Sequence, residues 1–278
     1  MIKKRKRWAV AGLVVLLLVF LFAIAVNDEM VVRYYRIPTG KVGQPVRIAL
    51  ITDLHSCYYG ENQRFLIEAV QQEQPDLVLF GGDIADDVIP HDNTRAVIEV
   101  LGAQYPCYYV SGNHEYWSRE IEDIKQMFRD NGIMVMEGDT DRVTIGDTTV
   151  NISGIDDPDG GKTAFFNQLD EVGSKLDEET FTVLLSHRPE QIDAYLEYRF
   201  DLILSGHAHG GQWRIPGLLN GLLAPDQGFF PRYAGGLYPF EEQVMIVSRG
   251  LAKESTRVPR FFNHRELVIV DIVPDSAE

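Results

Sequence analysis

The chain has 278 residues, with 41 aspartates and glutamates against 26 lysines and arginines, and its formal net charge is −15. Hydrophobic residues at 45% and charged residues at 24% are ordinary globular values, which exclude a wholly disordered chain. The acidic balance excludes a protein whose main role is to bind nucleic-acid phosphates. The charge is uneven, however: residues 3–7 are all basic and the first acidic residue is Asp28, so the rest of the chain carries a net charge of −20.

An apolar segment, Trp8–Val26, separates the basic head from the acidic remainder. As a helix this segment would extend roughly 28 Å, close to the thickness of a bilayer core. We therefore expect residues 1–26 to be a cytoplasmic head with a transmembrane signal anchor, which places the domain of residues 27–278 outside the cell membrane. Ala23-Ile24-Ala25 also fits the small-x-small site of a cleavable signal peptide, so cleavage stays an alternative.

The first half of the acidic body alternates buried strand patterns with helical patterns. After a first strand at Glu29–Ile37, helical patterns near residues 62–73, 93–101 and 119–130 each follow a buried strand. These three buried strands are predicted at Val46–Thr52, Leu77–Gly81 and Cys107–Ser111. The alternation predicts parallel strands joined by crossover helices.

The second half changes character. Short apolar runs separated by glycine and aspartate turns in residues 133–155 predict an antiparallel second sheet. Residues 210–238 are rich in glycine, proline and aromatic residues, which favours an ordered surface loop. Four further strands are expected at Phe181–Ser186, Leu202–Ser205, Val244–Ser248 and Glu266–Ile272, with a helix near residues 190–198. The body is therefore expected to be one α/β domain of two sheets flanked by helices.

Aspartate, histidine and asparagine side chains follow five of these strands. They are Asp53 and His55, Asp83, Asn113 and His114, His187, and His207 and His209. Ligands of open α/β sheets bind outside the carboxyl ends of the strands, so we expect these side chains to converge at one edge. A single histidine after a strand is ordinarily a hydrogen-bonding residue, but five of the chain's seven histidines lie here. Carboxylate, imidazole and amide groups together predict a site for Mn, Fe, Zn or similar divalent ions.

The same blocks, Asp-x-His, Gly-Asp, Gly-Asn-His-Glu, His and Gly-His-x-His, resemble in this order the motifs of the calcineurin-like metallophosphoesterases over Val46–His209. The resemblance implies a four-layer αββα sandwich of two mixed sheets and a catalytic His114 that binds no metal. It implies two divalent metal ions, Mn, Fe or Zn, which share Asp83. One would be held by Asp53, His55, Asp83 and His209, and the other by Asp83, Asn113, His187 and His207. Glu115 would orient His114.

Three later segments, Gly210–Gln212, Val247–Leu251 and Arg260–Asn263, are similar to a narrower branch, the bacterial membrane-associated phosphodiesterases that include enzymes cleaving UDP-2,3-diacylglucosamine. That branch implies a membrane-anchored monomer that cleaves a phosphodiester or pyrophosphate bond, the phosphate-ester substrate being lipid-linked or an envelope precursor. A phosphomonoesterase or phosphoprotein phosphatase with the same site is an alternative. A non-catalytic anchored module that keeps the metals for structure is another.

Two weaker signals lie outside these blocks. Arg249 follows a predicted strand and either binds a phosphate of the substrate or makes a surface ion pair. Apolar and aromatic side chains between Trp213 and Tyr233 either form a small core beneath a long loop or an apolar platform turned to the bilayer. Asp86 is expected to cap a helix or accept a hydrogen bond behind a metal ligand.

Overall fold

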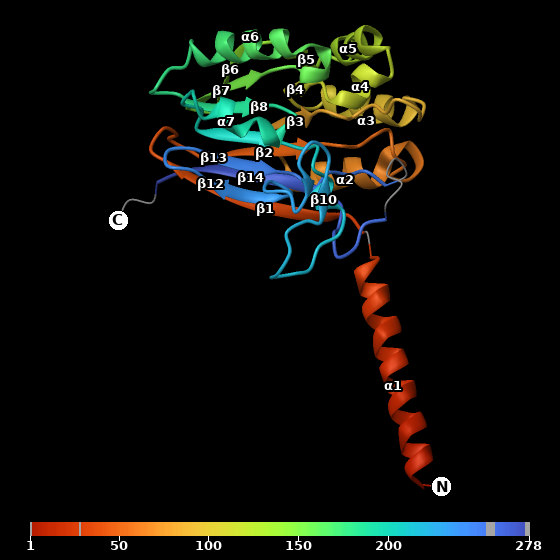
Figure 1. Ribbon diagram of the computed structural model, residues 1–278. Helices are drawn as coiled ribbons and strands as arrows, with labels where there is room; N and C mark the ends of the chain where they lie inside the picture. The colour runs from red at the N-terminus through yellow and green to blue at the C-terminus, as the bar shows by residue number, and fades with distance from the viewer. Residues whose placement is uncertain (1, 28, 254–258, 276–278) are drawn as a thin grey trace.

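The computed structural model describes residues 2–27, 29–253 and 259–275, with the side chains of residues 2–6 and 9 outside that description. Two six-stranded sheets are stacked on one another, with helices on their outer faces (Figure 1). The first sheet has the order β1 (Val31–Thr39), β14 (Glu266–Pro274), β2 (Val46–Ile51), β3 (Leu77–Gly81), β4 (Cys107–Val110), β5 (Met134–Val135). The second has the order β12 (Gly236–Pro239), β13 (Val244–Val247), β9 (Leu202–Ser205), β8 (Phe181–Leu185), β7 (Thr148–Gly154), β6 (Asp139–Ile145).

Both sheets are mixed, as expected. Strands β2 to β5 are parallel to one another, and β14 is antiparallel to β2. In the second sheet β13, β9, β8 and β7 are parallel, while the edge strands β12 and β6 are antiparallel to their neighbours. The prediction that residues 133–155 form an antiparallel second sheet is wrong in part. Only β6 and β7 form a hairpin, whereas β5 pairs with β4 in the first sheet because it ends a further strand–helix–strand crossover.

Side-chain alternation along the strands separates the core into three layers. In β2, Ile48 and Leu50 face the space between the sheets, whereas Ala49 and Ile51 face the outer helices. The helices on the first sheet are α2 (Arg64–Glu73), α3 (Asp92–Gly102) and α5 (Ile121–Asp130). Those on the second sheet are α6 (Lys162–Gly173), which we did not predict, and α7 (Ile192–Tyr195). The layer order is therefore helix, sheet, sheet, helix.

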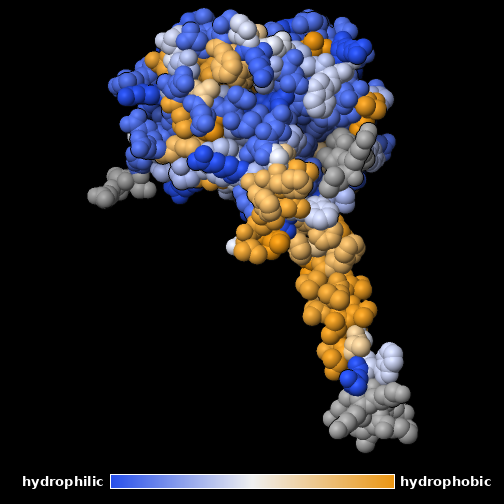
Figure 2. Space-filling model, in the orientation of Figure 1, coloured by the Kyte–Doolittle hydropathy of each residue, from blue (hydrophilic) through white to orange (hydrophobic). Residues whose placement is uncertain are grey.

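Helix α1 (Ile2–Ala25) extends away from the sandwich (Figure 1), and most of its length is apolar (Figure 2). Its end is held by a backbone hydrogen bond of 2.6 Å from Phe262 N to Ala25 O and by an edge contact between Phe22 and Phe261. Within the described residues, no helix combines the length and the apolar character needed to cross a membrane. The predicted transmembrane helix at Trp8–Val26 is therefore not confirmed.

Candidate metal centre

The loops that follow five strands bring the predicted ligands to one end of the sandwich. Those strands are β2, β3 and β4 of the first sheet and β8 and β9 of the second. Short helix α4 (Asn113–Trp117) begins directly after the Ser111-Gly112 turn that ends β4. All seven predicted ligands are buried, namely Asp53, His55, Asp83, Asn113, His187, His207 and His209. Burying this many ionisable groups is unfavourable unless they are paired or hold a metal ion.

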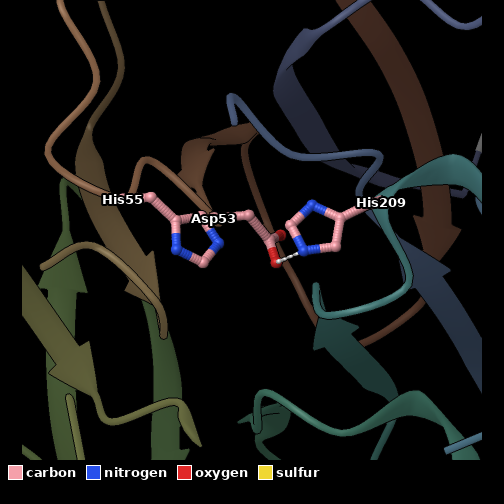
Figure 3. A group of neighbouring side chains, drawn as sticks. All are labelled: Asp53, His55 and His209. Carbon is pink, nitrogen blue, oxygen red and sulfur yellow. Dashed lines mark ion pairs between the residues drawn. The ribbon is translucent and has the colours of Figure 1, made fainter. Parts of the chain in front are cut away.

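One group of ligand atoms comes from Asp53, His55 and His209, which all lie within 4.8 Å of one another. The imidazole rings of His55 and His209 stand on either side of the Asp53 carboxylate (Figure 3). His209 Nε2 lies 3.8 Å from Asp53 Oδ1, which also accepts a hydrogen bond from the backbone N–H of His207. This bond orients the carboxylate and leaves Asp53 Oδ2 without a hydrogen-bond partner.

A second group comes from Asp83, His187 and His207, again within 4.8 Å. Asp83 Oδ2 lies 3.1 Å from His187 Nε2 and 3.6 Å from His55 Nε2, which belongs to the first group. The other oxygen, Oδ1, accepts a hydrogen bond of 2.8 Å from the backbone N–H of His114. One carboxylate oxygen therefore lies between the two groups, where a shared ligand has to be.

Among the described residues, six buried atoms of the predicted ligands have no assigned hydrogen bond. They are Asp53 Oδ2, His55 Nε2, Asn113 Oδ1, His209 Nδ1, and the atoms Asp83 Oδ2 and His187 Nε2, which face each other only as an ion pair at 3.1 Å. Such orphaned atoms are rare in folded proteins, and a cluster of them requires an explanation. The opposite ring nitrogens of two histidines are occupied, since His55 Nδ1 contacts Asp86 Oδ2 at 3.1 Å and His187 Nδ1 contacts Gly81 O at 2.8 Å. This pattern is typical of metal ligands, and the residues present fit divalent ions.

The backbone at five of these positions has a positive φ that L-residues rarely adopt. The φ angles are 50° at Asp53, 48° at His55, 52° at Asp83, 64° at His207 and 46° at His209. A non-glycine residue in this region costs about 1–3 kcal/mol, and such residues cluster at functional sites. The strain at these positions supports a functional role for the loops that is independent of the sequence motifs.

Gly250 lies directly against Asp53. Its φ is +70°, and a Cβ atom there would lie 2.5 Å from Asp53 Cβ. We expect Gly250→Ala to displace the carboxylate and to weaken metal affinity about 10–100-fold, as measured by metal titration. Gly228 is a matched control, because its φ is +68° and nothing lies within 4 Å of the added Cβ. Equal metal affinity of Gly250→Ala and Gly228→Ala would contradict this role of Gly250.

Burial and mutual pairing shift the titration of these groups in opposite directions. Burial alone would raise the pKa of Asp83, but the neighbouring His187 and His55 hold that pKa well below its usual value. Burial alone would lower the pKa of His187, yet the Asp83 carboxylate raises it to about 10. In the absence of metal His187 is therefore an imidazolium paired with Asp83. Metal binding at this group has to release that proton.

His114 lies at the edge of the two groups. Its ring is 4.3 Å from that of His55, and its side chain is 20% exposed, so it is accessible to a molecule from solvent. His114 Nδ1 lies 2.7 Å from Asp87 Oδ1 and 3.5 Å from Asp86 Oδ2. Burial lowers the pKa of His114, but Asp86 and the other nearby carboxylates more than offset this and raise it to about 9. Although His114 also lies within reach of a group formed by His55 and Asp86, its Nδ1 atom already pairs with Asp87.

Glu115, expected to orient His114, hydrogen-bonds to backbone groups of two loops. Its carboxylate accepts hydrogen bonds from the backbone N–H groups of Gly112, Asp83 and Ile84, at 2.8, 3.0 and 2.7 Å. At the third position of α4 its side chain points back over the first turn and accepts from the backbone N–H of the N-cap residue Gly112. Glu115 therefore holds the loop that carries Asp83.

Asp86 and Arg188 support two of the ligand histidines. Asp86 accepts from His55, as expected, and its second oxygen caps the backbone of residues 88 and 89. Arg188 was missed: it is buried, pairs with Asp157 at 2.5 Å, and places Nη1 3.2 Å from His207 Nε2. Asp226, also missed, contacts both Arg188 and His207 from the long loop. For Arg188 and Asp226, the one sequence feature that could have indicated a role is that Arg188 directly follows the predicted ligand His187.

The predicted phosphate-binding residue Arg249 directly precedes Gly250, which lies against Asp53. Arg249 is a buried side chain, paired with Glu266, and so is not a surface ion pair.

A family model described as calcineurin-like phosphoesterase matches residues 46–211, more than half of the chain. The chain belongs to this family. This phosphoesterase is 28% identical over 250 residues to the uncharacterized metallophosphoesterase YkuE of Bacillus subtilis, with 87% of this chain and 84% of YkuE covered. An uncharacterized metallophosphoesterase of Helicobacter pylori is 32% identical over 177 residues, which is 62% of this chain but only 46% of that relative. Among solved structures, GAP50, the anchor in the inner membrane complex of Plasmodium, matches with a TM-score of 0.50 and 13% identity over 82% of this chain and 81% of its own, a likeness of fold alone.

Proposed function

We propose that this phosphoesterase uses two metal ions to hydrolyse a phosphodiester or pyrophosphate bond. The observation that carries the proposal is Asp83 Oδ2, which lies between a group of Asp53, His55 and His209 and a group with His187 and His207. Asn113, expected to be a ligand with His187 and His207, also has a buried side-chain oxygen that lacks a hydrogen-bond partner among the described residues. When bound, two divalent ions would supply a water acidified to near-neutral pKa and positive charge for the phosphate oxygens.

The remaining chemistry belongs to side chains of the chain. His114 is exposed enough to meet a substrate, and its Nδ1 is held by Asp87, which leaves the second ring nitrogen for the leaving oxygen. In its protonated form His114 can donate a proton to that oxygen or stabilise its charge. Such general-acid catalysis is typically worth about 10²–10⁴-fold in rate.

The pairing with Asp87 predicts how activity depends on pH. Because the pKa of His114 is raised to about 9, the acid form is populated below that value and is lost as the pH rises through it. Asp87→Asn removes a charge that favours the imidazolium, so we expect the alkaline limb of the kcat profile to move to lower pH by on the order of one unit. Asp123→Asn, at an exposed position of α5, is the control. An alkaline limb that stays in place in Asp87→Asn would contradict the role of His114 as an acid.

A panel of substrates tests the reaction itself. The full chain, loaded separately with Mn, Fe or Zn, is offered bis(p-nitrophenyl) phosphate, p-nitrophenyl phosphate and a nucleotide sugar with a pyrophosphate bond. Faster turnover of the diester or the pyrophosphate is the expected result. Faster turnover of the monoester would favour the phosphomonoesterase alternative, and no turnover with any metal would favour the non-catalytic module.

We further propose that residues 27–278 act outside the cytoplasm, held at the cell membrane by residues 1–26, on a lipid-linked or envelope precursor. The run of basic residues 3–7 before an apolar segment supports this orientation. The described side chains of α1 are mostly exposed, for example Leu13 at 69% and Phe20 at 62%. Alkaline extraction of membranes and protease treatment of intact cells would test attachment and sidedness. Release of the full chain at high pH, or protection from external protease, would count against the proposal.

A further inference from the structure

A cavity of about 700 Å³ lies at the C-terminal end of α1, where Ile24 lines it. Of the described residues that line it, four are basic, namely Arg33, Arg214, Arg249 and His264, and none is acidic. None of the seven predicted metal ligands lines it. In a chain with 41 acidic and 26 basic residues, a cavity wall of this composition runs against the overall charge and points to an anionic ligand.

The arginines of this cavity are close together and incompletely neutralised. Arg214 Nη1 and Arg249 Cγ both lie within 3.2 Å of the point where a Cβ atom on Gly235 would be. Glu266 is shared by Arg249, at 2.5 Å, and Arg33, at 3.9 Å. Arg214 donates to Gly210 O and to the side chain of Asn220, which are both uncharged. One carboxylate therefore faces three guanidinium groups.

One of these guanidinium groups has a free donor. Arg249 is only 7% exposed, and its Nη2 atom has no hydrogen-bond partner among the described residues. Leaving a buried charged donor unpaired is costly, so such an atom indicates a missing acceptor. A phosphate oxygen is the acceptor that guanidinium groups match best, because it can take two parallel N–H bonds.

The rim of the same cavity is apolar and exposed. Leu218 is 82% exposed and Ile215 is 49% exposed, and both line the cavity together with Ile24 of α1. The loop continues through Phe229 and Phe230, at 70% and 68% exposure, near the hairpin of β10 (Leu223–Ala224) and β11 (Gly228–Phe229). In Figure 2 this loop and the upper part of α1 form one apolar surface.

The exposed fractions of the apolar side chains in this loop show whether they form a small core or an exposed platform. Of the side chains predicted to form either a small core or a platform, Tyr233 packs into the core of the second sheet, whereas Trp213, Leu218, Phe229 and Phe230 remain exposed. An exposed apolar patch of this kind marks an interaction surface, not a core.

We propose that this cavity binds the phosphate headgroup of an anionic membrane lipid, with the acyl chains along Ile215, Leu218 and α1. Arg33, Arg214 and Arg249 hold the phosphate, while the apolar rim excludes water from the chains. A zwitterionic headgroup would place its ammonium group among three arginines, in a cavity with no acidic side chain among the described residues that line it. The site goes beyond the proposed reaction, because it docks the domain on lipid without consuming that lipid.

Calorimetric titration of the full chain in a non-ionic detergent tests the site. The probes are dihexanoyl phosphatidic acid, dihexanoyl phosphatidylcholine and glycerol 3-phosphate. We expect phosphatidic acid to bind at least tenfold more tightly than either of the others. Arg33→Gln and Arg214→Gln should each weaken that binding about fivefold, whereas Arg64→Gln, an exposed arginine on α2, should not change it.

A third variant covers the apolar half of the site. Leu218→Ser, at an exposed position where folding is insensitive to the change, should also weaken phosphatidic acid binding without altering the melting temperature. Equal binding of glycerol 3-phosphate would show a site for free phosphate, and equal binding of phosphatidylcholine would show apolar adsorption alone. Phosphatidic acid binding that is lost in Asp83→Asn but unchanged in Arg33→Gln and Arg214→Gln would place the lipid at the metal centre. Each of these three results would overturn the proposal, and the binding readout stands whether or not the proposed reaction occurs.

Discussion

Replacement of His114 by alanine is expected to leave the metal content unchanged and to lower kcat by about 10²–10⁴-fold. We expect this because His114 Nδ1 is held by Asp87. The unpartnered buried atoms that fit metal ions belong to other side chains. The change therefore removes a proton donor while the ligand cage stays in place. Elemental analysis of the purified variant, combined with steady-state kinetics on bis(p-nitrophenyl) phosphate, measures both effects.

His91→Ala is the matched control for that experiment. His91 lies near the same loop, but the hydrogen bond of its ring is to the backbone oxygen of Asp86, at 2.9 Å. We expect this variant to keep both its metal content and its kcat. An unchanged kcat in His114→Ala would remove His114 from the mechanism, and a loss of metal equal to that of a ligand variant would make it a ligand.

Asp83→Asn is expected to have the largest effect, with metal lost from both groups and kcat lowered by about 10³-fold or more. Asp83 Oδ2 is the oxygen that lies 3.1 Å from His187 and 3.6 Å from His55. An amide in this position carries no charge, and the pKa of His187 would lose the carboxylate that raises it. Competition assays with a metal chelator would measure the loss at each group.

Comparison of Asp53→Asn with Asp83→Asn distinguishes a ligand that belongs to one group from a ligand that both groups share. Asp53 lies with His55 and His209 only, so we expect this variant to lose metal from that group and to retain it at Asp83, His187 and His207. If Asp83→Asn kept as much metal as Asp53→Asn, the shared position assigned to Asp83 would be wrong.

The placement of the predicted ligands follows from simple features of the sequence. Each ligand block comes directly after a buried apolar strand, and the strands within each sheet that carry these blocks are parallel, so their carboxyl ends meet at one edge. The resemblance supplied the grouping around Asp83. Resemblance to the narrower branch predicts a phosphodiester or pyrophosphate bond, and the substrate panel tests that prediction.

Other parts of the site depend on contacts that a linear reading does not reveal. Arg188 and Asp226 are 38 positions apart, and only the folded loop brings them together at His207. Glu115 was assigned to His114 because they are adjacent in sequence, whereas the first turn of α4 directs the carboxylate to the opposite loop. The strand at Met134–Val135 was assigned to the wrong sheet because two residues carry too little pattern to choose a neighbour.

The total charge of the chain gave no indication of the cluster formed by Arg33, Arg214 and Arg249. The net charge of −15 describes the average of the chain and not the wall of one cavity. The three arginines come from β1, the long loop and the turn after β13, and in the folded chain they line the same cavity. Local composition of a cavity is therefore a better guide to its ligand than net charge is.

The left-handed backbone at Asp53, His55, Asp83, His207 and His209 has a consequence for the choice of metal. Strained angles of this kind persist only where the surrounding structure holds them, so the packing of the two sheets helps to set the positions of the donors. A set of mixed carboxylate, imidazole and amide donors suits several first-row metals, whose intrinsic affinities for such a site differ in a fixed order. We therefore expect the abundance of each metal to decide which ion is bound, so that the same chain made in a different medium carries a different metal.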